Sequence, residues 1–187
     1  SSIKASDGIF RLGLSAGSTP VSLYRELAKL YQEGAVSFNR VEIYSIDEYY
    51  PAPAYSHSRN RRLFEELIDK VDIKPEAVHI PRIDELKDSS YVSDFCTKYD
   101  QIASNLDLLI MGVGEKGQIG FNEHGASELS RTRTVLLSYP SRKRQAKNFA
   151  GKVEMTPNSA IAMGISTMLS AKKIYLLAWG EDKAQVV

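Results

Sequence analysis

Hydrophobic and polar positions follow two patterns that alternate along this chain. Short apolar runs predict β-strands at residues 9–14, 41–46, 78–80, 106–111, 132–138 and 173–178. Stretches with apolar residues three and four positions apart predict helices at 20–34, 58–71, 89–104 and 159–169. Strands that alternate with helices predict an α/β fold, with a three-layer, doubly wound, mainly parallel sheet and helices on both of its faces.

The details of this pattern say where a ligand would bind. The run at 106–111 is almost entirely apolar, as expected for a strand at the centre of a parallel sheet. In such sheets ligands bind beyond the carboxyl ends of the strands. The segments in those places, which are also rich in glycine, hydroxyl and charged residues, are 15–19, 47–49, 112–125 and 180–183. We therefore expect these segments to converge on one crevice.

Length and composition are those of one globular domain. The chain has 187 residues, of which 43% are hydrophobic and 25% are charged. The first predicted strand begins at residue 9, and residues 180–187 have the pattern of a turn and the start of a helix. We expect a single domain over 1–187 that is truncated at both ends.

Charge and reactive residues exclude several classes of partner. The formal net charge of +1 provides no overall field that would favour nucleic acid, and no apolar run approaches the length of a membrane span. The single cysteine, Cys96, cannot form an intrachain disulfide and suits a reducing cytoplasm. His57, His79 and His124 lack metal-ligand spacing, so no metal site is expected. A small phosphorylated ligand is compatible with these properties, because a local pocket can be positive on a nearly neutral protein.

The segment from Ser15 to Pro20 has the composition of a phosphate-binding loop. Gly17 allows close approach to the backbone, hydroxyl groups can donate hydrogen bonds, and free N–H groups at the start of the next helix favour an anion. An ordinary strand–helix turn with Thr19 as N-cap and Pro20 at the first helical position explains these residues equally well. Lys183, after the last predicted strand, offers a counter-charge, although an isolated lysine there is commonly solvated.

Two acids follow the second predicted strand. Asp47 and Glu48 end an apolar run, where a carboxylate can have a raised pKa and act as a general base. The alternative is that these acids cap a helix or form an ion pair. From these two residues alone, this structural role is favoured over the catalytic one.

Two further segments carry candidate chemistry. The Gly-x-Gly-x-x-Gly pattern at 112–117 lies late in the chain, and 121–123 interrupts the helix that a dinucleotide site requires, so NAD binding is rejected. The basic stretch 141–147 is either a lid over a phosphate or a solvated helix face, and composition favours the second.

Taken together, these segments resemble the glucosamine-6-phosphate deaminase (isomerase) family over nearly the whole chain. The resembling motifs, in order, are LGLSAGSTP at 12–20, IDEY at 46–49, GVGEKGQIGFNE at 112–123, SRTR at 130–133, TPNSA at 156–160 and GEDK at 180–183. The resemblance implies that glucosamine 6-phosphate is ring-opened, that a proton moves between C2 and C1, and that ammonia leaves to give fructose 6-phosphate. It implies no metal or organic cofactor, and a cytoplasmic homo-oligomer is expected.

The same resemblance assigns roles to individual positions. Asp47 matches the enolising base, and Glu123 matches the acid that supports the ring-opening histidine. The positions that match substrate- or phosphate-binding residues are Ser15, Gly17, Ser18, Thr19, Gly114, Lys147 and Lys183.

The departures from the family pattern concern ring opening. Gln118 stands in place of the family histidine, Lys116 in place of an acid, and Lys147 in place of an arginine. Glutamine can hydrogen-bond a ring oxygen but cannot shuttle a proton near neutral pH, so ring opening should be impaired unless Lys116 assists, for example by pairing with Glu123. The alternatives are a non-catalytic sugar-phosphate binder and, with less support from the motifs, a 6-phosphogluconolactonase.

Overall fold

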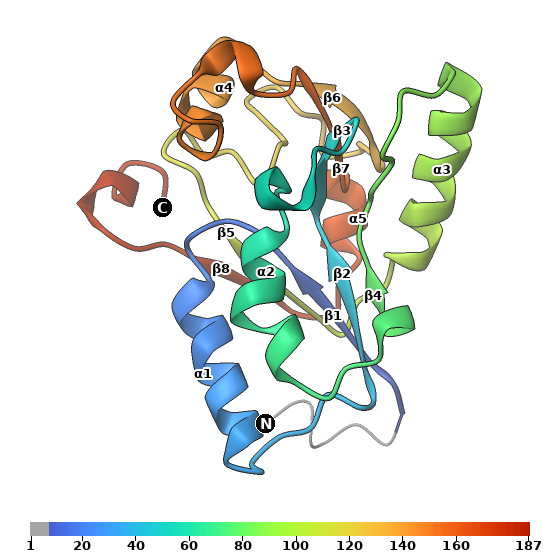
Figure 1. Ribbon diagram of the computed structural model, residues 1–187, viewed down its shortest axis with the longest axis vertical. Helices are drawn as coiled ribbons and strands as arrows, with labels where there is room; N and C mark the ends of the chain where they lie inside the picture. The colour runs from blue at the N-terminus through green and yellow to red at the C-terminus, as the bar shows by residue number, and fades with distance from the viewer. Residues whose placement is uncertain (1–7) are drawn as a thin grey trace.

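A computed structural model describes residues 8–187 and contains a five-stranded parallel sheet at its centre (Figure 1). The strand order is β4-β2-β1-β5-β8. The strands are β1 (Phe10–Leu14), β2 (Val41–Ser45), β4 (Val78–His79), β5 (Leu108–Gly112) and β8 (Ile174–Leu177). The predicted strands at 9–14, 41–46, 78–80, 106–111 and 173–178 are therefore confirmed, with boundaries within two residues.

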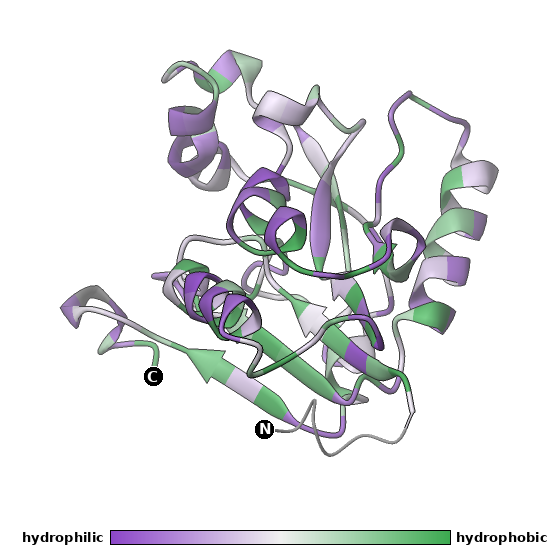
Figure 2. Ribbon diagram, turned by 60° about the horizontal axis from the view of Figure 1, so that its bottom comes forward, coloured by the Kyte–Doolittle hydropathy of each residue, from purple (hydrophilic) through white to green (hydrophobic). Residues whose placement is uncertain are grey.

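Helices cover both faces of this sheet. They are α1 (Val21–Gln32), α2 (Arg61–Glu66), α3 (Ser89–Ile102) and α5 (Ile165–Leu169). Alternate strand residues point to opposite faces: Leu12 and Ile43 pack with the residues of α1 and α2, whereas Leu109 packs with those of α3 and α5. Figure 2 shows that hydrophobic residues concentrate on these strands. The three-layer, doubly wound arrangement is confirmed.

A second, smaller sheet was not predicted. It is antiparallel, in the order β3-β7-β6, and consists of β3 (Asp47–Tyr50), β7 (Ser159–Ala162) and β6 (Arg133–Leu136). Strand β3 follows β2 after one residue, Ile46, so the chain passes directly from the main sheet into the small one. The strand predicted at 132–138 exists, but it belongs to this antiparallel sheet.

The predicted helix at 159–169 is wrong in its first half. Residues Ser159–Ala162 form β7, and only Ile165–Leu169 are helical. Ala160, Ile161 and Ala162 are fully buried, and β7 pairs with β3 on one side and β6 on the other. Two ladders of hydrogen bonds outweigh the helix preference of the alanines, because intrinsic propensity is a small effect beside pairing and burial.

Helix ends also differ from the prediction. Helix α1 begins at Val21 with Pro20 in the cap position, and Thr19 makes no side-chain cap bond. The predicted helix at 58–71 is shorter, because α2 ends at Glu66 and a 3-10 turn, η2 (Ile68–Lys70), follows. The basic stretch forms α4 (Tyr139–Gln145) and the 3-10 turn η4 (Ala146–Asn148). The other 3-10 turns are η1 (Tyr55–His57), η3 (Pro75–Ala77), η5 (Val153–Met155) and η6 (Glu181–Lys183).

The strand order creates a crevice between β1 and β5. From β1 the chain proceeds to β2 and β4 on one side, and it then returns to place β5 on the other side of β1. At such a switch point the loops after the two strands diverge and leave room for a ligand. The loops in question are 15–19 and 112–120.

Candidate active site

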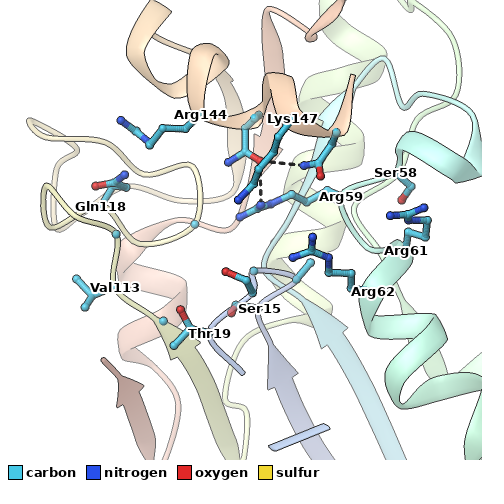
Figure 3. A pocket seen from close by; sticks show the side chains of 18 of the residues that line it. Ser15, Thr19, Ser58, Arg59, Arg61, Arg62, Val113, Gln118, Arg144 and Lys147 are labelled. Atoms are coloured by element: carbon cyan, nitrogen blue, oxygen red, sulfur yellow. Dashed lines mark hydrogen bonds between the residues drawn. The ribbon is translucent and has the colours of Figure 1, made fainter. Parts of the chain in front are cut away.

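A polar pocket of about 210 Å³ occupies this crevice (Figure 3). Its base is the loop after β1, and one wall comes from the segment that leads into α2. The loop after β5 and the α4–η4 segment form the remaining walls. The predicted site residues that line it are Gln118, which was predicted to be catalytic, and all the predicted binding positions: Ser15, Gly17, Ser18, Thr19, Gly114, Lys147 and Lys183. Asp47, Lys116 and Glu123 do not line it.

The loop after β1 is held firmly by its neighbours. Its start is tied to β5 by the Ser15 N–H, which donates to the carbonyl oxygen of Ile110 at 3.1 Å. The buried hydroxyl of Tyr24 donates to the Ser15 carbonyl oxygen at 2.5 Å. The Trp179 indole N–H donates to the Thr19 carbonyl oxygen at 2.9 Å, which links the loop to the segment after β8 that carries η6. A rigid loop of small and hydroxyl residues is suited to bind an anion through its backbone N–H groups.

The pocket concentrates positive charge on a chain of net charge +1. The basic side chains that line it are Arg59, Arg61, Arg62, Arg144, Lys147 and Lys183, against one acid, Glu115. The arginines before and in α2 were missed by sequence reasoning. The only available signal was the dense basic run at 59–62, which has the same composition as a solvated helix face.

Arg62 is open to a ligand, as is the exposed Lys147 of the same set. The side chain of Arg62 is half-buried and makes no ion pair or hydrogen bond with the residues at 8–187. In Figure 3 it lies beside Ser15 and below Arg59. Arg61, by contrast, is 3.8 Å from the carboxylate of Glu65.

Asp47 lies directly behind the pocket wall. Its side chain is fully buried, and Oδ1 is 3.2 Å from the Nε of Arg59, whose side chain is 15% exposed. No donor is in hydrogen-bonding geometry with Oδ2, which is the one buried side-chain nitrogen or oxygen atom in the described part of the chain with that property. Burial raises the pKa of Asp47 above its ordinary value, although the Arg59 guanidinium and, to a smaller extent, the backbone N–H of Phe121 oppose this shift.

Glu48 has a different environment from that of Asp47. Both of its oxygens are occupied: Oε1 accepts from the N–H groups of Tyr49 and Arg59 at 2.9 and 2.8 Å. Oε2 accepts from the Ser58 hydroxyl and the Asn60 amide at 2.5 and 3.1 Å. Glu48 therefore fixes the segment that carries Arg59, whereas Oδ2 of Asp47 has no side-chain or backbone donor in hydrogen-bonding geometry.

The loop after β5 forms a tight turn over the pocket. The Gly114 N–H donates to the Gln118 carbonyl oxygen at 2.8 Å, and the Lys116 N–H donates to the side-chain Oε1 of Gln118 at 3.0 Å. A Cβ atom on Gly114 would lie 2.2 Å from the end of the Gln118 side chain, so a larger residue there would displace that side chain. The side-chain carbonyl of Gln118 is thus already engaged by its own loop.

Glu123 is placed against α4 and not against Lys116. Its Oε1 accepts from the Ser138 N–H at 3.4 Å. Burial opposes ionisation of Glu123, but hydrogen bonds from Ser141 and Ser138 outweigh it and lower the pKa. Within the described residues no ion pair joins Lys116 to Glu123.

The described residues contain neither a metal-binding cluster nor a membrane-spanning helix. Over residues 8–187, no three side chains among His, Cys, Asp and Glu gather in a way that could hold a metal ion. No helix in that part of the chain is long and apolar enough to cross a membrane.

Comparison with known proteins identifies relatives over most of the chain. The family model for glucosamine-6-phosphate isomerases/6-phosphogluconolactonase matches residues 1–187. Glucosamine-6-phosphate deaminase 2 of Bacillus subtilis is 38% identical over 94% of this chain and 71% of its own length. A putative glucosamine-6-phosphate deaminase-like protein of Bacteroides thetaiotaomicron is 39% identical over 94% of this chain, but this match covers only 27% of that relative.

Solved structures agree with this result. A monomeric glucosamine-6-phosphate deaminase superposes with a TM-score of 0.87 and 32% identity, covering 98% of this chain and 75% of that chain. A 6-phosphogluconolactonase from Thermotoga maritima, at a TM-score of 0.72 and 18% identity over 98% of this chain and 76% of its own, shares the fold. On the match of the family model to all 187 residues, the chain belongs to the glucosamine-6-phosphate isomerase/6-phosphogluconolactonase family.

Proposed function

We propose that the protein converts glucosamine 6-phosphate and water to fructose 6-phosphate and ammonia. In this reaction Asp47 takes the proton from C2 of the open-chain sugar and returns a proton to C1, and hydrolysis then releases the nitrogen as ammonia. The phosphate is bound by the loop at 15–19 together with Lys147 and Lys183. Binding at the phosphate holds the sugar so that C2 reaches the base.

The observation that carries this proposal is the position of Asp47. A fully buried carboxylate with one unpaired oxygen lies at the edge of a strongly basic pocket. An unpaired buried oxygen costs free energy on folding, and such groups are commonly retained where they act in catalysis. Curated relatives that are 38% and 40% identical carry the name glucosamine-6-phosphate deaminase, which supports the same reaction.

Ring opening is the step that we propose to be slow. Gln118 cannot transfer a proton near neutral pH, and its Oε1 already accepts from the Lys116 N–H. The enzyme would then depend on sugar that has opened in solution. The state of Gln118 also favours a second candidate function, that of a sugar-phosphate binder with little or no turnover.

Ammonia release from glucosamine 6-phosphate tests the reaction, with Asp47→Asn as the matched control. We expect release by the unchanged protein and a loss on the order of 10²-fold or more in the variant. Release no greater than that of Asp47→Asn would refute catalysis. Saturable binding of glucosamine 6-phosphate by calorimetry, without turnover, would then identify the binder.

A double substitution, Gln118→His with Lys116→Asp, addresses ring opening directly. If only this step is impaired, the deaminase rate should rise while the affinity for inorganic phosphate stays unchanged. An unchanged rate would show that another step limits the protein.

Assembly and location are also proposals. We propose a cytoplasmic protein, on the basis of its single, buried cysteine. A homo-oligomer was expected from the sequence, whereas the superposed deaminase is described as monomeric. Light scattering coupled to size-exclusion chromatography decides between a monomer and an oligomer.

A further inference from the structure

We propose that Arg59 is a positioning residue that orients the Asp47 carboxylate through Oδ1, so that Oδ2 is the atom that takes the proton. We also propose that Gly120 keeps the path from the pocket to Oδ2 open. This inference rests on the proposed function, because it assigns parts of the site to the proton transfer carried out by Asp47.

Arg59 is held on three sides, so its guanidinium cannot easily leave Asp47. The guanidinium carbon lies 4.8 Å from the centre of the Phe121 ring, a distance typical of a cation–π contact. Nη1 donates to Oε1 of Gln145 at 3.5 Å. The Arg59 backbone N–H donates to Oε1 of Glu48 at 2.8 Å. The geometry at Oδ1 is therefore set by three separate elements of the fold.

The opposite oxygen of Asp47 faces a glycine. A Cβ atom placed on Gly120 would lie 2.6 Å from Oδ2, which is closer than any stable contact. Gly120 also has φ of +58°, a left-handed conformation that glycine adopts without strain. Gly120 lines the pocket, whereas Asp47 does not. The space that a Cβ atom on Gly120 would fill is therefore the direct route from the pocket to Oδ2.

The charges around Asp47 make Arg59 important for its protonation state. Burial raises the pKa of Asp47, and the Arg59 ion pair is the main opposing influence. The other titratable groups that interact with Asp47 are Glu48 and Tyr49 of β3, Tyr24 of α1 and Tyr99 of α3. Each of them is an acid whose ionised form would be negative, so Arg59 is the cation among these groups that favours ionised Asp47.

Arg59→Met tests the positioning role, because methionine keeps much of the side-chain volume and removes the charge. The acidic limb of kcat/KM should move to higher pH, since Asp47 then binds its proton more tightly. The expected loss near neutral pH is on the order of 10- to 100-fold, greater at acidic pH and mainly in kcat. Arg59→Lys should restore part of the pH profile, because it keeps the charge but loses the planar contact with Phe121.

The control is Arg25→Met, which removes another arginine–carboxylate pair outside the pocket, with Glu66 at 2.6 Å. Its pH profile should match that of the unchanged protein. A change in KM alone for Arg59→Met would make Arg59 a direct ligand of the substrate. Reduced thermal stability with an unchanged pH profile would make its role structural. Either result would overturn the proposal.

Gly120→Ala tests the path to Oδ2. We expect kcat to fall at least tenfold, with the affinity for inorganic phosphate retained, because the added methyl group would stand between the pocket and Oδ2. Retained kcat would refute this part of the proposal.

Titration of the Asp47 carboxyl carbon by NMR, without substrate, tests the role of Arg59 separately from the proposed reaction. If the unchanged protein releases no ammonia, the proposed reaction fails, but Arg59→Met should still raise the pKa of Asp47. If ammonia is released and the Asp47 titration is the same in both proteins, the role of Arg59 fails while the reaction stands.

Discussion

Glu48→Gln separates the two adjacent acids that composition and strand pattern alone could not distinguish. Glu48 is fully buried, and its two oxygens accept four hydrogen bonds, from Tyr49, Arg59, Ser58 and Asn60. Glutamine keeps the shape of the side chain but replaces one acceptor oxygen with a donor group. In the least costly arrangement the new NH₂ group takes the place of Oε2 and donates to the Ser58 hydroxyl. The Asn60 amide, which donates to Oε2 of Glu48, then loses this acceptor.

The magnitude follows from this count of bonds. A buried donor left without a partner costs about 1–3 kcal/mol, and the remaining bonds lose their charge assistance. We expect a total loss of about 2–3 kcal/mol in the free energy of unfolding. For a chain of this length that corresponds to a fall in Tm of about 4–12 °C.

Differential scanning calorimetry measures this change, and Glu65→Gln is the matched control. Glu65 lies in α2 and forms an exposed pair with Arg61 at 3.8 Å, so its loss should change stability by less than about 0.5 kcal/mol. The reasoning is refuted if Glu48→Gln and Glu65→Gln have the same Tm.

Three further substitutions test other parts of the structure. Asp100 accepts from the Thr132 N–H and hydroxyl at 2.8 Å each; burial opposes its ionisation, but these bonds and others lower its pKa. Asp100→Asn should therefore cost about 2 kcal/mol at neutral pH, and urea unfolding should show the difference shrinking as pH falls and the native carboxylate is protonated. Gly164→Ala should lower stability by about 3 kcal/mol in the same assay, because its Cβ would lie 2.1 Å from the backbone oxygen of Ser130, and a fully stable variant would contradict this. Arg62→Ala should weaken binding of glucosamine 6-phosphate about tenfold by calorimetry, and an unchanged Kd would show that Arg62 does not contact the phosphate.

Some residues that line the pocket could be identified from the sequence, and others could not. Ser15, Thr19, Gln118 and Lys183 line one pocket, as their positions after parallel strands indicate. Arg59 and Arg62 could not be assigned from the sequence, because a basic run before a helix has the same composition whether it faces solvent or a cavity.

By itself the sequence determined the alternation of strands and helices, and with it the parallel sheet and the edge at which the pocket lies. These features follow from local patterns: apolar runs such as 106–111 are buried on both faces, and small residues at 15–19 end a strand. Local patterns also located Asp47 and Glu48 just after the second strand, but they did not distinguish the two acids.

Only the tertiary structure shows the small antiparallel sheet and the difference in hydrogen bonding between the two acids. Residues Ser159–Ala162 are a strand because β3 and β6, more than 20 residues away, supply partners on both sides. Both oxygens of Glu48 accept hydrogen bonds from residues 49–60. Asp47 instead faces Arg59 and Gly120, which comes from a distant loop. Pairing and burial of this kind depend on which segments meet in space, and no local pattern contains that information.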